Sequence, residues 1–438
     1  MEVPVREWSH WAAGYGLPRA SLKLLARRGD PLARLLTIDA NPVNDIYPLI
    51  EQVRSRGRMS PVNMVGWVSA DAQIVREVLR DGRFRTVKYR DRSPFRIVQW
   101  ILAKTTPDVL NPLEPPSMLV TDPPEHTRLR RLVSRAFTPR ALDVLRTRIH
   151  EVADGLLRGL QNSAECDLIT EYTSRIPIAV IAEMLAIPQD ETRHLRAIGE
   201  STTRLVSTTA VSWRDFRAAT NALREFDQYL AKHIERLRQT DAANSILSDV
   251  VRDGDLTEIE IRMLAGLLLG AGFVTTSHVF GKAVVALVRH PDQLAALCAN
   301  PEGWPNAIEE ILRYDTTVQL AGRVATEDVD IQGYPIRAGE TVFLLIGGAN
   351  RDPAIFENPD TFDTTRANAR EHISFGTGVH ACLGGALARM ELHIGLQSLF
   401  EHLPQLTLAG EPTFNDTIGL HGLKHLPVSL GPSDVIVP

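Results

Sequence analysis

The chain has 438 residues, of which 44% are hydrophobic and 23% are charged, and its net charge is −5 at pH 7. This composition is that of an ordinary globular protein, and the negative balance argues against a nucleic-acid binder, because neutralising phosphates needs an excess of positive charge. The three cysteines, Cys166, Cys298 and Cys382, are odd in number and far apart, so they do not form a disulfide framework, and a reducing compartment is favoured.

The N-terminal stretch has no secretory pattern, because charges interrupt it and no apolar core follows. Its tryptophans, Trp8 and Trp11, and the basic residues 23–28 predict a packed terminal helix rather than a segment on a membrane surface. The longest apolar run, residues 263–274, has twelve residues, whereas a membrane span needs about twenty. We therefore expect a cytoplasmic protein without a transmembrane segment.

Helical periodicity dominates the rest of the chain. Apolar residues recur at intervals of three and four from Thr138 onward, with Thr138 as the expected N-cap and Pro139 at the first helical position. The same pattern covers residues 174–188 and 216–239. Strand-like stretches are short and few: residues 64–69, 328–336 and 340–347. The sequence predicts a mainly α chain with small β-sheets (α+β), without an internal repeat or a linker between domains.

One predicted helix is unusually long. Thr257 and Glu260 form a capping-box pattern at its start, and Pro291 follows its end. The helix would extend roughly 50 Å, and its middle is apolar nearly all round, so it should pass through the core. Thr275 can direct its hydroxyl at the carbonyl of Ala271, which bends a helix. This region is either a close contact between helices or a groove that holds a ligand.

Cys382 stands in an unusual context, because the segment 372–392 (HISFGTGVHACLGGALARMEL) surrounds it with glycines and then begins a helical pattern. The residues allow four chemistries: a structural thiol, a zinc ligand, a nucleophile with His380 as base, and a thiolate ligand to haem iron. Gly376 and Gly378 permit close approach of the backbone to a flat macrocycle, and a helix N-terminus stabilises a thiolate. The spacing alone leaves these alternatives open.

The same segment resembles a known family signature. Its matches to the haem-binding pattern F-G-x-G-x-H-x-C-x-G of the cytochrome P450 superfamily are Phe375, Gly376, Gly378, His380, Cys382 and Gly384. Glu310 and Arg313 resemble the family's E-x-x-R pair, and Arg366 lies in a segment similar to the one that supplies the third member of that network. The resemblance extends from about Asp122 to the C-terminus, whereas residues 1–60 match only loosely. The chain is most similar to soluble bacterial, actinobacterial-like members.

The resemblance implies a single cytochrome P450 domain over residues 1–438, with haem b (iron protoporphyrin IX) between the long central helix and the cysteine-bearing loop. Cys382 would be the metal ligand, a thiolate whose electron donation favours O–O cleavage, with Phe375 and Gly376 beside the porphyrin. The positions that correspond to partners of the haem propionates are His126, Arg130, Arg323 and His372. A buried carboxylate left unpaired there would cost on the order of 3–5 kcal/mol.

On the oxygen side, AGFVTT is similar to the family pattern A-G-x-[D/E]-T-T, which implies that Thr275 is the catalytic alcohol. Val274, however, occupies the position of the acid and cannot relay a proton. Either protons arrive through water ordered by Thr275 and a second group such as His278, or the enzyme is atypical and works by peroxide, coupling or rearrangement. We favour the first interpretation, because Thr275 and the neighbouring glycines are retained.

The family resemblance implies a monooxygenase that inserts one atom of O2 into a hydrophobic lipid, steroid, terpene or polyketide-like molecule. Seven arginines and one acid lie between residues 126 and 148, which suits the docking of an acidic ferredoxin, so a separate ferredoxin and ferredoxin reductase are expected. The candidate pocket residues are Phe95, Val98, Trp100, Ile101, Leu205, Val206, Ala271, Val274, Val318 and Leu320. The remote alternatives are a non-haem Cys–His enzyme and a ligand-binding protein.

Overall fold

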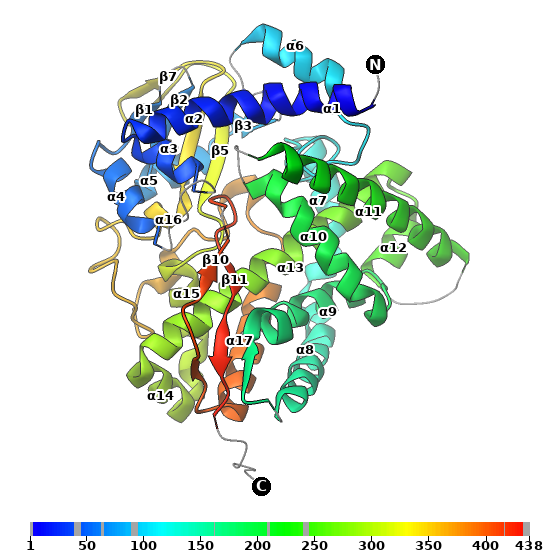
Figure 1. Ribbon diagram of the computed structural model, residues 1–438, viewed down its shortest axis with the longest axis vertical. Helices are drawn as coiled ribbons and strands as arrows, with labels where there is room; N and C mark the ends of the chain where they lie inside the picture. The colour runs from blue at the N-terminus through cyan, green and yellow to red at the C-terminus, as the bar shows by residue number, and fades with distance from the viewer. Residues whose placement is uncertain are drawn as a thin grey trace.

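Helices make up most of the molecule in the computed structural model, which describes residues 3–38, 45–62, 65–88, 95–161, 163–207, 211–239, 245–415 and 417–431 (Figure 1). The described helices are α1 (Val3–Trp11), α2 (Leu17–Arg27), α3 (Pro31–Leu36), α4 (Tyr47–Arg54), α5 (Ala72–Arg80), α6 (Arg96–Thr105), α7 (Glu125–Ser134), α8 (Pro139–Leu160), α9 (Arg175–Met184), α10 (Thr192–Ser207), α11 (Trp213–Gln239), α12 (Ile246–Asp253), α13 (Glu258–Arg289), α14 (Pro291–Ala299), α15 (Trp304–Tyr314), α16 (Ile346–Ala349) and α17 (Gly385–His402). The predicted fold class is confirmed.

The strands are short and form small sheets. They are β1 (Ser60–Val62), β2 (Gly66–Ser69), β3 (Phe84–Thr86), β4 (Glu165–Asp167), β5 (Leu320–Ala325), β6 (Val329–Ile331), β7 (Tyr334–Ile336), β8 (Thr341–Leu345), β9 (Thr407–Leu408), β10 (Thr413–Phe414), β11 (Leu423–His425) and β12 (Pro427–Ser429). The largest sheet has the order β1-β2-β8-β5-β3, with β2 parallel to β8. The predicted strand at 328–336 is the β6–β7 hairpin, and the start of the predicted strand at 64–69 lies partly outside the described residues.

The long predicted helix is α13, which crosses the centre of the molecule (Figure 1). Its capping box forms as predicted, since the amide of Glu260 donates to the Thr257 hydroxyl and the amide of Thr257 donates to the Glu260 carboxylate. Its length and hydropathy would also suit a membrane span, but a core helix has the same composition. Nineteen of its 32 residues are buried against neighbours that include α9, α10, α11 and α17.

The start of α8 differs in one detail from the prediction. Thr138 has the extended backbone of an N-cap, and Pro139 occupies the first helical position. The Thr138 hydroxyl, however, donates to the carbonyl of Arg135 at 3.2 Å instead of accepting from the first turn. The side-chain cap therefore does not form, and α7 and α8 are joined by a tight turn at residues 135–137.

A buried ionic network supports the loop that carries Cys382. Arg313 donates twice to Glu310 at 2.7 and 2.8 Å, and neither side chain is exposed to solvent. Arg366 donates to both oxygens of the same carboxylate at 3.2 and 3.3 Å. The hydroxyl of Ser374 then donates to a carbonyl at the end of α15. The three residues of the E-x-x-R network thus meet as the resemblance implied. Arg313 also donates to the carbonyl of Asn350, whose side chain bonds Ser374 and the amide of Ile373 directly before the cysteine loop.

Candidate active site

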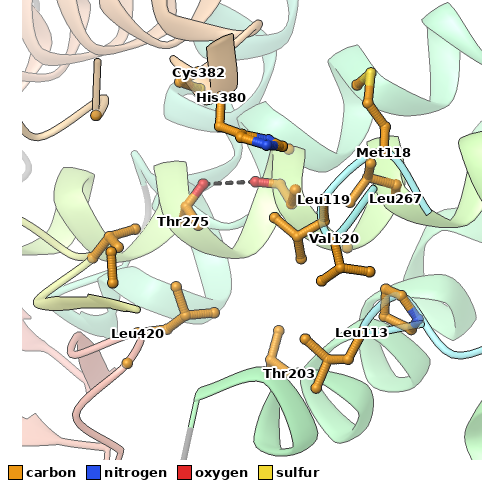
Figure 2. Close-up of a pocket in the computed structure, with 18 of the residues that line it drawn as sticks. Leu113, Met118, Leu119, Val120, Thr203, Leu267, Thr275, His380, Cys382 and Leu420 are labelled. Carbon is orange, nitrogen blue, oxygen red and sulfur yellow. Dashed lines mark hydrogen bonds between the residues drawn. The ribbon is translucent and has the colours of Figure 1, made fainter. Parts of the chain in front are cut away.

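A cavity of about 690 Å³ lies between the middle of α13 and the cysteine loop (Figure 2). Its walls come from the segment 110–120, α7, α10, α11, α13, β5 and residues 374–384. Most of the side chains around it are apolar, among them Leu113, Met118, Val120 and Leu267, which Figure 2 shows on the side away from Cys382. A cavity of this size and polarity suits a flat cofactor together with a hydrophobic ligand.

The cysteine loop lies at one end of this cavity. The amide of Cys382 donates to the carbonyl of Phe375 at 2.8 Å, which closes the loop on itself. Gly376 and Gly378 have φ values of +66° and +74°, a conformation that side chains disfavour. A Cβ on Gly378 would lie 2.6 Å from the carbonyl oxygen of Leu79. The close approach predicted for Gly378 is therefore made to the end of α5, while Gly376 and Phe375 line the cavity.

Cys382 lines the cavity. Its side chain is therefore exposed to the cavity space, while the surrounding protein separates it from bulk solvent. Burial raises the pKa of this thiol, while a hydrogen bond from the Gly384 amide and the charges of Arg130 and Arg389 oppose the shift. The helix that follows begins at Gly385, three residues on. The expected support for a thiolate is present, but burial outweighs it, so the net shift of the Cys382 pKa is upward.

A group of cationic and imidazole side chains gathers at one side of the cavity. Arg323 and Arg130 both line it, and their side chains donate to main-chain carbonyls, of Gly322 at 2.9 Å and of Val379 at 3.3 Å. Burial lowers the pKa of Arg323. His126 is buried beside His380, with ring centroids 4.2 Å apart, and burial lowers the pKa of His126 to about 4.

These side chains fit the two carboxylates of a haem. Within the part of the chain that the structure describes, the hydrogen bonds of Arg130 and Arg323 go to main-chain carbonyls, and guanidinium groups bind carboxylates more strongly than they bind carbonyls. The Nε2 atom of His380 is buried without a hydrogen bond in the described structure, and the nearest carboxylate, that of Asp122, lies 3.8 Å away. Sulfur and cations at separate points of one cavity are the donor set that a haem requires.

His372 is absent from the cavity lining and bonds to protein groups, so its contact with a propionate stays a prediction. Its Nε2 donates to Glu309 at 3.0 Å, and its Nδ1 accepts from the amide of Ser374 at 3.1 Å. Although burial opposes the shift, hydrogen bonds from His372 and Arg389 lower the pKa of Glu309 to about 2. Both ring nitrogens of His372 are hydrogen-bonded, so the side chain supports the start of the cysteine loop.

Thr275 lies across the cavity from Cys382 (Figure 2). Its hydroxyl donates to the carbonyl of Ala271 at 2.7 Å, as predicted, which leaves its oxygen free to accept a hydrogen bond from the cavity side. Val274 is 3% exposed and packs into the core cluster around α13. The expectation that Val274 lines the pocket is therefore wrong, because neighbouring residues on a helix point about 100° apart.

A buried polar group lies behind Thr275 on the same helix. The Thr317 hydroxyl donates to the carbonyl of Thr275 at 3.4 Å, and one turn along, the Nδ1 atom of His278 is buried with no hydrogen-bond partner in the described structure. Burial, reinforced by the charge of Lys282, lowers the pKa of His278 to about 3. His421 is similar, since burial and the same ammonium lower its pKa to about 3. Of these two histidines, only His278 was singled out by the sequence, because it lies one turn after Thr275 on the predicted helix.

Glu391 is a further buried carboxyl on the cavity wall, on α17 nine residues after the cysteine. Burial raises its pKa to about 8, and its Oε1 has no hydrogen-bond partner in the described structure. The group is therefore neutral at pH 7. Its sequence signal was weak, because an acid that interrupts an apolar helical face is usually solvent-exposed.

The predicted pocket residues divide into two sets. Ala271, Val318 and Leu320 line the cavity. The others lie elsewhere: Phe95 and Trp100 are exposed, Val98, Ile101 and Leu205 pack in a cluster with N-terminal residues, and the side chain of Val206 lies outside the described structure. The segment from Leu110 to Val120 does line the cavity, and its sequence has no clear periodicity that would show which side chains face inward.

Comparisons with known proteins agree with this geometry. The family model "Cytochrome P450" matches residues 104–300 and 305–420. The putative cytochrome P450 140 of Mycobacterium tuberculosis is 38% identical over 435 residues, which are 98% of this chain and 98% of that protein. The vitamin D(3) 25-hydroxylase of Pseudonocardia autotrophica is 40% identical over 326 residues, 72% of this chain and 78% of that protein.

A solved structure is similar over most of the chain. P450BioI, in complex with an acyl carrier protein ligated to hexadec-9Z-enoic acid, superposes with a TM-score of 0.79 at 31% identity, over 89% of this chain and 98% of that one. A family match across more than half of the chain, together with a cavity lined by Cys382, Arg130 and Arg323, leads to one conclusion. The chain belongs to the cytochrome P450 family and is a haem-dependent monooxygenase.

Proposed function

We propose that Cys382 is the thiolate ligand of the haem iron. It is the cysteine on the wall of the large cavity, and the Gly384 amide and two arginines favour its ionised form. The haem, when bound, supplies the activation of O2. On the same argument, Arg130, Arg323 and His126 hold the propionates, because they face the cavity from the side where cationic groups gather.

The reduced, CO-bound absorption spectrum tests this assignment. The parent protein should show the red-shifted Soret band of a thiolate-ligated haem, and Cys382→Ser should lose it. Cys298→Ser is the matched control, since Cys298 is an exposed cysteine outside the cavity, and it should keep the parent spectrum. A Cys382→Ser protein with an unchanged spectrum would exclude this cysteine as the ligand.

The reaction we propose is insertion of one oxygen atom of O2 into a hydrophobic small molecule, with the second atom leaving as water. The apolar walls of the cavity support a lipid, steroid, terpene or polyketide-like substrate. Thr275 holds its hydroxyl hydrogen toward Ala271 and offers its oxygen to an ordered water in the cavity. Incorporation of label from ¹⁸O2 into the product distinguishes insertion from coupling or rearrangement, which would leave the product unlabelled.

The lack of an acid at Val274 supports the atypical reaction as the second candidate. The side chain at this position points into the core, so the conformation seen here would keep even an acid out of the cavity. Proton supply must then come from other groups, and His278 behind Thr275 is the candidate that we favour. Turnover driven by hydrogen peroxide alone at the rate supported by O2 and electrons would favour the atypical mechanism instead.

We further propose that a separate ferredoxin, reduced by its reductase in the cytoplasm, supplies the electrons. Phe137 lies between the exposed residues Arg135 and Arg140, and its ring approaches the position of a Cβ on Gly384 to 3.9 Å. The exposed arginines of this turn therefore lie next to the cysteine loop, and an acidic partner would be steered there. Arg135→Glu/Arg140→Glu should slow reduction by ferredoxin at low salt, whereas Arg337→Glu on the β7–β8 turn should not.

A further inference from the structure

Exposed apolar side chains concentrate at the N-terminal end of the molecule. The described structure has thirteen large hydrophobic residues that are exposed, and eight of them lie on α1, on α2, or on α6 and the residue before it: Val5, Trp8, Leu17, Leu24, Leu25, Phe95, Ile97 and Trp100. This set includes every exposed tryptophan and phenylalanine of the described residues. Apolar patches of this kind on a soluble protein usually mark an interaction site.

The three helices form one surface, which we call the apolar end. α1 and α2 follow each other across one end of the molecule, and α6 lies beside α1 (Figure 1). Arg6 donates to the carbonyl of Thr106 at 2.7 Å, and His10 hydrogen-bonds Thr105 at 3.2 Å, so α1 is fixed against the end of α6. None of the eleven residues of α2 is buried. The terminal helix is thus packed as predicted, but only along one side.

The apolar end is also basic, although the whole chain is acidic. Residues 3–28 and 95–105 contain seven lysines and arginines: Arg6, Arg19, Lys23, Arg27, Arg28, Arg96 and Lys104. Glu7, the one acid in these ranges, is buried and paired with Arg224. Aromatic and leucine side chains among lysines and arginines are the composition of helices that lie in the headgroup region of a membrane.

The inner side of the same helices reaches the cavity. Gly14, in the π-helical segment between α1 and α2, and Pro18, in the first turn of α2, both line it. Val65 and Leu119 also line the cavity and are 37% and 41% exposed. The cavity therefore extends from the haem side to the underside of the apolar end. A hydrophobic molecule that entered from this end would not have to cross bulk water.

We propose that the apolar end docks the protein peripherally on a membrane that contains anionic lipids, with α1, α2 and α6 lying in the headgroup region. The charge of the surface is complementary to lipid phosphates, and its aromatic side chains suit the interface. An acidic protein would match the arginines and lysines, but it would leave no reason for eight exposed apolar residues on the rounded end of three helices. This docking goes beyond the proposed catalytic function and does not require it.

Co-sedimentation of the full-length holoprotein with lipid vesicles tests the proposal. The protein should sediment with phosphatidylcholine–phosphatidylglycerol vesicles, and less with phosphatidylcholine alone. Trp8→Ser/Trp100→Ser should weaken binding at least tenfold. Arg27→Gln/Arg28→Gln should weaken it about fivefold per charge removed, and only when phosphatidylglycerol is present. Brominated lipids should quench tryptophan fluorescence in the parent and much less in the tryptophan variant.

Two controls separate this surface from others. Val144→Ser/Ile259→Ser removes exposed apolar residues outside the apolar end, and Arg135→Gln/Arg140→Gln removes charge beside the cysteine loop; both should bind vesicles like the parent. The proposal is overturned if the parent binds neither kind of vesicle, or if the variants of the apolar end bind as the parent does. A dimer in sedimentation velocity that the tryptophan variant abolishes would assign this surface to a second copy of the chain and equally overturn the proposal.

Discussion

The ammonium of Lys282 lies 2.8 Å from the carboxylate of Asp315, and the lysine side chain is 2% exposed. The same ammonium donates to the carbonyl of Thr316 at 3.0 Å. The contact joins the core helix α13 to the segment that follows α15 and lines the cavity. Burial lowers the pKa of Lys282, while the Asp315 carboxylate opposes that shift. This charged pair, with a buried lysine and an Asp315 side chain that is 24% exposed, therefore fixes the position of residues beside Thr275.

Removing one member of this pair should be strongly destabilising. Lys282→Met leaves the Asp315 carboxylate without its main partner, and the free energy of unfolding should fall by about 3–5 kcal/mol. Lys282→Met/Asp315→Leu should recover much of that loss, because no charge remains buried. Urea unfolding of the haem-loaded proteins measures both values. A double variant as unstable as the single one would contradict the assigned cause.

Thr275→Ala should raise the fraction of electrons that are released as hydrogen peroxide several-fold, because the alanine cannot order water near bound oxygen. Thr276→Ala is the matched control, since its hydroxyl donates to the Gly272 carbonyl in the same way at 2.9 Å, and it should change coupling less. Peroxide formed per NADPH consumed is the measurement. Unchanged coupling in Thr275→Ala would reject a role for this hydroxyl.

His278→Ala tests the proton supply and the burial of the imidazole together. The pKa of His278 is about 3 in the folded protein, against about 6.5 for an unperturbed histidine. Its stabilising contribution is therefore complete above pH 6.5 and is lost as the pH falls toward 3. The variant should show a weaker loss of stability over that range. If its kinetic solvent isotope effect equals that of the parent, the imidazole is not part of the relay.

Arg323→Gln should weaken the hold on haem. An unpaired buried propionate costs on the order of 3–5 kcal/mol, so haem transfer to apomyoglobin should be at least a hundredfold faster than in the parent. Arg337→Gln, at an exposed arginine outside the cavity, is the control and should transfer haem at the parent rate. Equal rates in all three proteins would remove Arg323 from the propionate site.

Glu391→Gln should change how stability depends on pH. The pKa of Glu391 is about 8 in the folded protein, against about 4.5 when exposed, so the parent loses stability as the pH rises from 4.5 to 8, by about 3 kcal/mol at pH 7. Glutamine keeps the shape without ionising. The variant should match the parent near pH 4.5 and exceed its stability at pH 8, as urea unfolding measures. Parallel stability curves would show that the carboxyl is not held neutral.

Local sequence pattern is enough to specify several parts of this protein. The capping box at Thr257 and the apolar run that follows it specify a core helix, because a helix that is apolar all round must be buried to keep its side chains out of water. The E-x-x-R pair lies on one helix face by its spacing. The glycines around Cys382 predicted a loop with unusual backbone angles, and Gly376 and Gly378 have them.

Only the tertiary structure decided which way side chains face once elements pack together. His372 and Arg323 both lie in segments that resemble the family, and both can carry a positive charge. His372, however, is bonded to Glu309, whereas Arg323 lines the cavity. The local sequence allows the apolar side chains of Phe95 and Trp100 to face either the cavity or solvent, and both are exposed. Burial also set the protonation of Glu391 and His278. The physical reason is that pKa, exposure and partner choice depend on neighbours distant in the chain, which local periodicity does not encode.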